Sequence, residues 1–214
     1  AGEFQPDKNF VLTENGTQLD YDYLILACGL KVDWDSIKGL HGKLGRDGIT
    51  SILSYSTLDW TKKVFSSFEN GRALFTHSDS VSNSDGPAKE MAFLMRSKLD
   101  MDARQTQTSI SYYSGSDKLF PVTSCERVFS EYFLKKGIQY HLAKELIEVR
   151  PKSREAIFMD LENNTVSVEK YDFLHIAPPM RSPFPVSRSP LSDSSGLVEV
   201  DPHTLQHTRY TNVF

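Results

Sequence analysis

The segment YDYLILACG, residues 21–29, has a near-copy in YDFLHIAPP, residues 171–179. Each copy follows a hairpin signal, Asn15-Gly16 for the first and Asn163-Asn164 for the second, because Asn and Gly tolerate the positive φ angles of tight turns. Each copy also contains a short apolar run that is typical of a buried strand. A hairpin followed by a strand, found twice, predicts one supersecondary unit that is used twice along the chain.

Length and composition indicate a folded protein of one large domain, or of one and a half. The chain has 214 residues, of which 39% are hydrophobic and 24% are charged. Its formal net charge of −4 provides no electrostatic attraction to nucleic acid or to an anionic membrane surface. No apolar run approaches the ~20 residues that span a bilayer, and no signal or transit peptide is visible.

Both ends of the chain suggest a piece of a longer protein. The start, residues 1–4, resembles a remnant of cloning. The end, residues 212–214, reads as an apolar strand without a cap. We therefore expect further chain on both sides.

The first third predicts a hairpin, a strand and a helix. Residues 10–13 and the segment from Gln18 onward flank the first turn and predict two paired strands. Residues 24–27 form a continuous apolar run, as in a strand covered on both faces. Residues 31–52 show no clear period and read as a connection, whereas residues 57–70 predict a helix.

The middle of the chain alternates between strands and helices. Strands are predicted at residues 72–76, 108–113 and 138–142, and helices at residues 86–99 and 124–136. This βαβαβ order predicts a parallel sheet with right-handed crossovers. The apolar residues of the second helix are expected to face the core: Val128, Phe129, Tyr132 and Phe133.

The last third predicts an antiparallel meander and a final strand. The three strands of the meander are expected at residues 144–150, 155–161 and 165–168. The second copy of the repeat follows, and residues 178–196 are rich in Pro and Ser, as in a loop. Short extended pieces are expected at residues 197–200 and 210–214.

The cysteines and histidines do not form the patterns of disulfide or metal sites. Cys28 and Cys125 are the only cysteines, too few for a disulfide framework in a chain of this length. His203 and His207 are four residues apart but have no third ligand nearby in the sequence. We expect Cys28 to be a small buried residue and Cys125 to lie at the start of a helix in a structural role.

A βαβαβ unit, a meander and a strand ending in small residues together resemble flavoproteins with two dinucleotide-binding domains. In that class each domain closes with a strand of the pattern (Y/F)-D-x-L-apolar-x-A-(T/S)-G, which residues 21–29 follow more closely than residues 171–179. The resemblance implies an α/β fold, a Rossmann-like βαβαβ three-layer domain with an antiparallel β meander, of the FAD/NAD(P)-binding two-domain type. It also implies that Ala27, Cys28 and Gly29 bind the cofactor, since small residues let the backbone approach a flavin nucleotide closely.

Four segments resemble the eukaryotic sulfide:quinone oxidoreductases more specifically: residues 145–150, 155–158, 174–180 and 200–214. Members of that family are monotopic flavoenzymes of the mitochondrial inner membrane. They pass two electrons from sulfide through a pair of redox cysteines to FAD and then to ubiquinone, a chemistry that suits thiolates. The resemblance implies FAD, sulfide and ubiquinone as cofactor and partners of the whole protein, with membrane association through segments outside this chain.

The resemblance also divides the chain into three parts. It implies a C-terminal remnant of the FAD-binding domain with a connection at residues 1–56, a second dinucleotide-binding-type domain at 57–179, and a return segment toward the FAD domain at 180–214. The family's Gly-rich phosphate loop is missing, since no G-x-G-x-x-G occurs in this sequence. We therefore expect the 214 residues alone to bind no FAD and to be inactive.

One departure from the family concerns a redox cysteine. The family reads roughly P-V-K-C-A-G-A-P-Q-K where this chain reads SVSNSDGPAK at residues 80–89, so Asn83 stands at the cysteine position. An amide cannot form the thiolate or the persulfide that this chemistry needs. One alternative is therefore a divergent or non-catalytic paralogue that has lost standard sulfide oxidation.

The composition of the same loop also indicates whether the chain could bind a nicotinamide cofactor. In related two-domain reductases it holds the NAD(P)H phosphates, but here it carries Asp79 and Asp85 and only one glycine, Gly86. Acidic side chains repel phosphate, and without more glycines the backbone cannot approach it closely. We expect no NAD(P)H site, which disfavours the remaining alternative, a relative of the type II NADH:quinone dehydrogenases.

Overall fold

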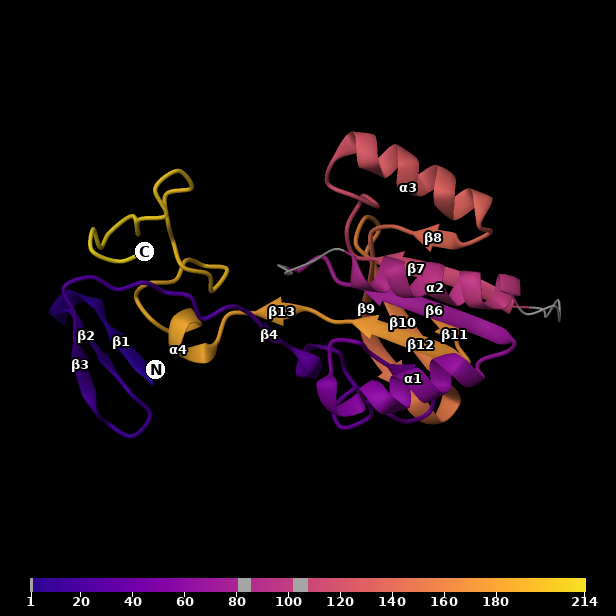
Figure 1. Cartoon of the computed structure of the whole chain (residues 1–214), viewed down its shortest axis with the longest axis horizontal. Coiled ribbons are helices and arrows are strands. Elements are labelled where there is room, and N and C mark those ends of the chain that lie inside the picture. The colour runs from indigo at the N-terminus through magenta and orange to yellow at the C-terminus, as the bar shows by residue number, and fades with distance from the viewer. Residues whose placement is uncertain (1, 81–85, 102–107) are drawn as a thin grey trace. The chain divides into compact units, whose positions relative to one another are not determined.

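The computed structural model describes residues 2–80, 86–101 and 108–214 (Figure 1). The chain divides into two compact units. The smaller unit combines the chain up to Lys31 with residues 180–214, and the larger unit comprises residues 32–179. Residues 32–56, expected in the first part of the chain with the connection, therefore fall within the larger unit.

A five-stranded parallel sheet forms the centre of the larger unit, in the order β5-β12-β6-β7-β8. Its strands are β5 Ile49–Thr50, β12 Phe173–Ala177, β6 Gly71–His77, β7 Thr108–Ser114 and β8 Gln139–His141. The predicted βαβαβ unit and its parallel pairing are thus confirmed. Strand β5 is missed by sequence reasoning because two residues within a glycine-rich connection show no period.

Helices cover one face of this sheet, and an antiparallel meander covers the other. The helices are α1 Leu58–Ser67, α2 Pro87–Met101 and α3 Thr123–Lys135, and the meander consists of β9 Lys144–Arg150, β10 Glu155–Asp160 and β11 Val166–Lys170. Neighbouring residues of β7 face opposite sides: Tyr112 packs in the helix-side core, and the Tyr113 ring stacks 4.1 Å from that of Phe158 in the meander. This is the three-layer α/β fold that the sequence predicts.

The orientation of α3 differs from the prediction. Phe133 is buried, with its ring centroid 4.9 Å from that of Phe93 on α2 and 5.6 Å from that of Tyr112. Val128, in contrast, is 60% exposed, and Tyr132 is also exposed. The prediction that all four apolar residues face the core is wrong for these two, because only one stripe of the helix reaches the sheet.

The smaller unit contains a second three-stranded antiparallel meander, whose second turn, between β2 and β3, confirms the predicted hairpin. Its strands are β1 Glu3–Gln5, β2 Phe10–Leu12 and β3 Gln18–Asp20. Phe4 is buried in the core of this unit, although its surrounding sequence resembles a remnant of cloning. The remaining short elements are β4 Lys31–Val32, β13 Met180–Arg181 and α4 Phe184–Ser187, of which the last two lie in the expected loop.

The internal repeat extends over both meanders. In each, a short 3₁₀ helix joins the first two strands, Pro6–Lys8 in one copy and Pro151–Ser153 in the other. Each 3₁₀ helix ends at a residue in the left-handed conformation, Asn9 or Arg154. The carbonyl of that residue accepts the N–H of the repeated tyrosine, at 2.9 Å in the first copy and 3.0 Å in the second. The duplicated unit is therefore a complete meander with the strand that follows it.

The closing strands of the two copies have equivalent neighbours on one edge. Leu174 in β12 donates its N–H to the carbonyl of Gly48 at 2.9 Å, and β12 runs parallel to β5. Leu24 donates its N–H to the carbonyl of Asn212 at 2.9 Å and forms a parallel bridge with Val213. Residues 212–214 therefore stand in the smaller unit where β5 stands in the larger one.

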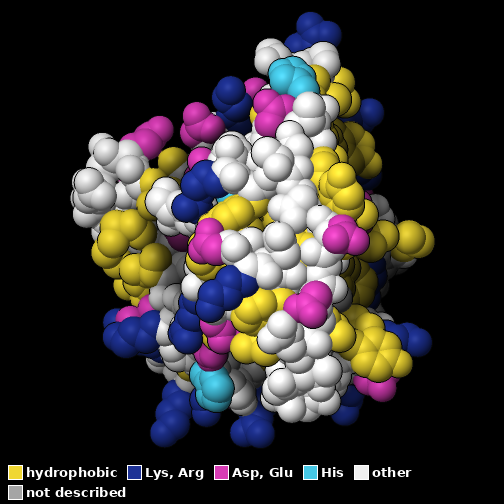
Figure 2. Space-filling view, turned by 90° about the vertical axis from the view of Figure 1, so that its left-hand side faces the viewer, with side chains coloured by type: hydrophobic (Ala, Val, Ile, Leu, Met, Phe, Trp, Pro, Cys, Tyr) yellow, Lys and Arg dark blue, Asp and Glu magenta, His cyan; other side chains and the backbone are white. Residues whose placement is uncertain are grey.

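Burial distinguishes the two copies. All of β12 is buried, whereas Tyr23 and Ile25 are 71% and 77% exposed. The prediction that residues 24–27 form a strand covered on both faces is wrong for this chain, because among the described residues Leu24 makes only a single bridge, to Val213, and the side chains of Ile25 and Ala27 are exposed. Figure 2 shows a face of the molecule on which apolar side chains reach the surface among charged ones.

Candidate functional site

The turn at residues 27–29 lies in the smaller unit, directly after the first closing strand. Ala27, Cys28 and Gly29 are all exposed, so the expectation that Cys28 is buried is wrong. Backbone hydrogen bonds join the segment before this turn to residues 212–214. Cys125, as expected, lies in the first turn of α3, where it is half-buried.

The geometry of this turn suits close approach by a flat ligand. Gly29 adopts a left-handed φ of 63°, and a Cβ built on it would meet no atom within 4 Å. A cavity of ≈ 190 Å³ adjoins the turn, and residues from the segments 182–186 and 197–198 also line it. Of the three consecutive residues predicted to bind a cofactor, Cys28 and Gly29 line this cavity and Ala27 does not.

A second cavity, of ≈ 290 Å³, lies in the larger unit at the carboxyl ends of β6 and β7. Its walls include the buried side chains of His77, Ser78, Lys89 and Ser114. Ligands of open α/β sheets bind outside the carboxyl ends of the strands, so this cavity occupies a typical ligand position. Asn83 and Asp85 belong to the loop that follows β6 but lie outside the described residues.

Lys89 has a structural role in this cavity. It is 3% exposed, and its ammonium donates to the carbonyl of Leu119. The ammonium also lies 5.1 Å from the ring centroid of Phe120 and 5.7 Å from that of Phe129. Lys89 thereby ties the first turn of α2 to the segment that follows β7.

Glu145 on the meander supports the start of the loop after β6. Its Oε2 accepts the backbone N–H of Asp79 at 3.0 Å. Burial raises the pKa of the Glu145 carboxyl, while the hydrogen bonds from the Asp79 N–H and the Ser78 hydroxyl act in the opposite direction. Gly115 packs against the same carboxylate. A Cβ on Gly115 would lie 1.9 Å from Glu145 Oε2, so the close approach requires glycine at this position. Sequence reasoning misses this contact, since it joins segments far apart in the chain.

His175 is fully buried in β12 and is held neutral. Its Nε2 accepts the N–H of Ile52 at 3.2 Å, and its ring stacks on Phe75 with centroids 6.0 Å apart. Burial lowers the pKa of His175 to about 3. His207, one of the two histidines four residues apart, is also buried, with Nε2 bonded to the carbonyl of Leu191 at 3.1 Å. Both histidines therefore act as structural hydrogen-bonding groups.

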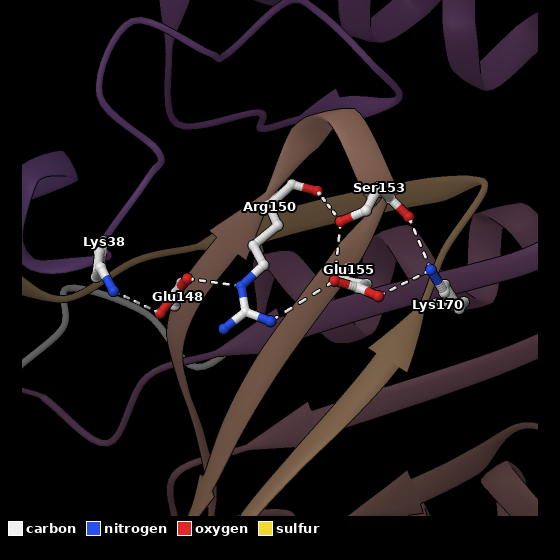
Figure 3. Close-up of polar contacts among 6 residues, drawn as sticks. All are labelled: Lys38, Glu148, Arg150, Ser153, Glu155 and Lys170. Atoms are coloured by element: carbon white, nitrogen blue, oxygen red, sulfur yellow. Dashed lines mark hydrogen bonds and ion pairs between the residues drawn. The ribbon is translucent and has the colours of Figure 1, made fainter.

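A chain of charges joins the meander to the segment before β5 (Figure 3). Glu148 bonds Lys38 at 3.0 Å and Arg150 at 2.8 Å. Glu155 bonds Lys170 at 2.8 Å and lies 3.7 Å from Arg150. These ion pairs join the hairpin of β9 and β10 to the segment around Lys38. They lie at the surface rather than around a cavity.

Within residues 2–80, 86–101 and 108–214, no helix combines the length and the apolar character needed to cross a membrane. No family model matches the chain.

Similarity to known proteins is continuous along the whole chain. The mitochondrial sulfide:quinone oxidoreductase of Dictyostelium discoideum is 34% identical over 99% of this chain and 47% of its own length. The mitochondrial sulfide:quinone oxidoreductase of Mus musculus is 33% identical over 100% of this chain and 48% of its own length. The chain thus spans about half the length of the curated relatives it matches.

Solved structures share the fold. The sulfide:quinone oxidoreductase from Aquifex aeolicus superposes with a TM-score of 0.79 at 21% identity, over 100% of this chain and 50% of that one. The NDH2 of Plasmodium falciparum, solved in complex with NADH, gives a TM-score of 0.65 at 16% identity, over 100% of this chain and 47% of that one. The two-domain flavoprotein architecture expected from the sequence is confirmed.

Proposed function

This chain belongs to the sulfide:quinone oxidoreductase family, and we propose from that premise that it is the central part of a longer FAD-dependent enzyme that oxidises sulfide. The observation that carries the proposal is the similarity along 99% of the chain to the Dictyostelium discoideum protein, at 34% identity. The electrons would pass to ubiquinone, at the mitochondrial inner membrane, through a protein about twice as long as this chain.

The smaller unit would supply part of the FAD-binding domain. Ala27, Cys28 and Gly29 would hold the flavin nucleotide, because their exposed backbone and short side chains leave room beside the turn. FAD, when bound, supplies the two-electron acceptor for the oxidation of sulfur. The phosphate loop must come from chain outside these residues, so the 214 residues alone would retain no FAD.

The larger unit would form the second dinucleotide-binding-type domain without using a nicotinamide cofactor. Asp79 and Asp117 line the cavity at the carboxyl ends of β6 and β7 together with Lys89 and Lys118, so the lining carries no excess of positive charge for a phosphate. Glu145 would position the start of the loop that leads to residue 83. The proposed electron donor is sulfide rather than NAD(P)H.

Asn83 gives the proposal its sharpest test. At the usual cysteine position an amide supplies no thiolate to attack sulfur, so sulfide oxidation would require another thiol. The longer protein should be purified and assayed for bound FAD and for sulfide-dependent reduction of a ubiquinone analogue, with Asn83→Cys as the matched variant. Turnover that depends on sulfide supports the proposal, and FAD binding without sulfide turnover in both forms would overturn it.

A second experiment tests the division of the FAD site. The purified 214-residue chain should show no flavin absorbance near ~450 nm, the usual region of the bound cofactor. Stoichiometric FAD in this chain would contradict the proposal that its FAD site is incomplete.

A further inference from the structure

The turn between β2 and β3 carries an Asn-Gly pair at the surface. Asn15 and Gly16 are both exposed. Gly16 has a left-handed φ of 82°, and no atom lies within 4 Å of the position that a Cβ would take on it. Because no side chain shields it, the backbone nitrogen of Gly16 can approach the side-chain carbonyl carbon of Asn15 closely.

Two donors of the same turn point at the Oδ1 atom of Asn15. The Thr17 N–H donates to it at 3.3 Å, and the Thr13 hydroxyl also donates to it. A backbone N–H can only donate, which identifies the facing atom of the amide as its oxygen. The Thr13 oxygen lies 3.0 Å from both the nitrogen and the carbonyl oxygen of Thr17, so the hydroxyl is held beside the amide. Donors at Oδ1 stabilise the negative charge that develops there when a nucleophile adds to Cγ.

Other asparagines near turns do not have this arrangement. Asn70 and Gly71 form a second Asn-Gly pair, but a Cβ on Gly71 would lie 2.4 Å from the Oδ2 atom of Asp172, so its backbone is crowded. Among the residues that the structure describes, none donates a hydrogen bond to the Asn70 side chain. Asn163, in the equivalent turn of the second copy, is not followed by glycine, and its amide nitrogen donates to Asp160 at 3.1 Å.

We propose that Asn15 is a site of spontaneous modification, at which the turn promotes conversion of the asparagine to aspartate or to its β-linked isomer. Hydroxide removes the N–H proton of Gly16, and the nitrogen adds to the Asn15 Cγ. The bond from Cγ to Nδ2 then breaks, and ammonia leaves with a proton from water, which regenerates hydroxide. Water opens the resulting cyclic imide at either carbonyl, and no electrons are gained or lost.

One contact opposes the reaction. The Gly16 N–H donates to the Thr13 carbonyl at 2.9 Å, and this bond must break before the nitrogen loses its proton. Hydrogen bonds to a charged oxygen are stronger than those between neutral groups, so the two donors at Oδ1 outweigh the lost bond. The inference concerns the hairpin itself and is independent of the proposed function.

The modification changes the hairpin locally. It adds one negative charge, and the β-linked product also adds one carbon to the backbone of the turn. The Thr13 N–H donates to the Thr17 carbonyl at 2.9 Å, across the loop that the additional carbon lengthens. Strand β3 is exposed along its whole length, so the change should not reach the core of the smaller unit.

Timed incubation of the longer protein near neutral pH, followed by mass spectrometry of its tryptic peptides, measures the rates at Asn15 and Asn70 separately. In the folded protein Asn15 should react faster than Asn70. In concentrated urea the two rates should become similar, because both residues precede glycine and the turn is lost. A rate at Asn15 that rises in urea would overturn the proposal, since the turn would then protect the amide.

A matched pair of substitutions tests the donor from Thr13. Thr13→Val removes the hydroxyl and should slow the reaction at Asn15 about 5-fold in the folded protein, equivalent to ~1 kcal/mol in the barrier. Thr13→Ser keeps the hydroxyl and should retain the parent rate. In urea all three proteins should react alike. An unchanged or faster reaction in folded Thr13→Val would refute the proposal.

Discussion

The carboxylate of Glu145, on the meander, accepts the backbone N–H of Asp79, just beyond β6, at 3.0 Å. This bond joins the meander to the carboxyl edge of the parallel sheet, where the second cavity opens. Contacts of this kind join segments that are distant in sequence, so the stability of the larger unit should depend on them.

Replacing Glu145 should loosen the start of the loop after β6. Glu145→Leu removes the acceptor and leaves the Asp79 N–H unpaired, at an expected cost of ~1–3 kcal/mol in the free energy of unfolding. Glu145→Gln keeps a carbonyl oxygen at the same position and should cost less than half as much. Urea unfolding of the two variants measures the difference, and equal losses would show that the hydrogen bond is unimportant.

Gly115→Ala should destabilise the larger unit. Its Cβ would lie 1.9 Å from Glu145 Oε2 and 2.7 Å from the backbone nitrogen of Asp79, so backbone or side chain must shift. Strain of this kind typically costs ~1–3 kcal/mol. In a double-mutant cycle, Glu145→Ala removes the shortest of the three contacts under 3 Å, so the combined loss should be smaller than the sum of the two single losses. Strict additivity would mean that the two residues do not interact.

His175 should make the fold sensitive to acid. Its pKa is about 3 in the folded chain against an ordinary value of 6.5, so the unfolded chain binds the additional proton first. The stability due to neutral His175 is therefore complete above about pH 6.5 and is lost as the pH falls toward 3, by at most ~1.4 kcal/mol per pH unit. Unfolding measured from pH 7 to pH 4 should show a flatter profile for His175→Gln than for the parent chain. His203→Gln, at an exposed position, serves as the control and should leave the profile unchanged.

The orientation of α3 can be tested with two truncations. Phe133→Ala empties a fully buried position beside Tyr112 and should cost ~3–5 kcal/mol in the free energy of unfolding. Val128→Ala, on the exposed side of the same helix, should change it by less than ~0.5 kcal/mol. A comparable loss in both variants would indicate that the helix packs through the face predicted from the sequence.

The sequence predicts the meander and the βαβαβ unit well because the physical signals for them are local. Alternation in residues 144–150, helical spacing after Gly86 and turn residues at Asn15-Gly16 each act within a few positions. These elements are found at the predicted places, with ends that differ by a few residues.

The turn at residues 27–29 shows what local sequence patterns cannot predict. Its residues were recognisable from the repeat and the small side chains, but the exposure of Cys28 was not, because burial depends on which strands lie alongside. Strand β5 is missed for the same reason: its two residues become a strand only through pairing with β12.

The amino-acid sequence alone determined the order of the longer helices and strands and the duplicated unit, since each depends on patterns of residue type along the chain. Only the tertiary structure decided that Glu145, Asp79 and Gly115 meet, and that one copy of the repeat is buried while the other is exposed. Those properties depend on contacts between distant segments, and local periodicity carries no information about which surfaces meet.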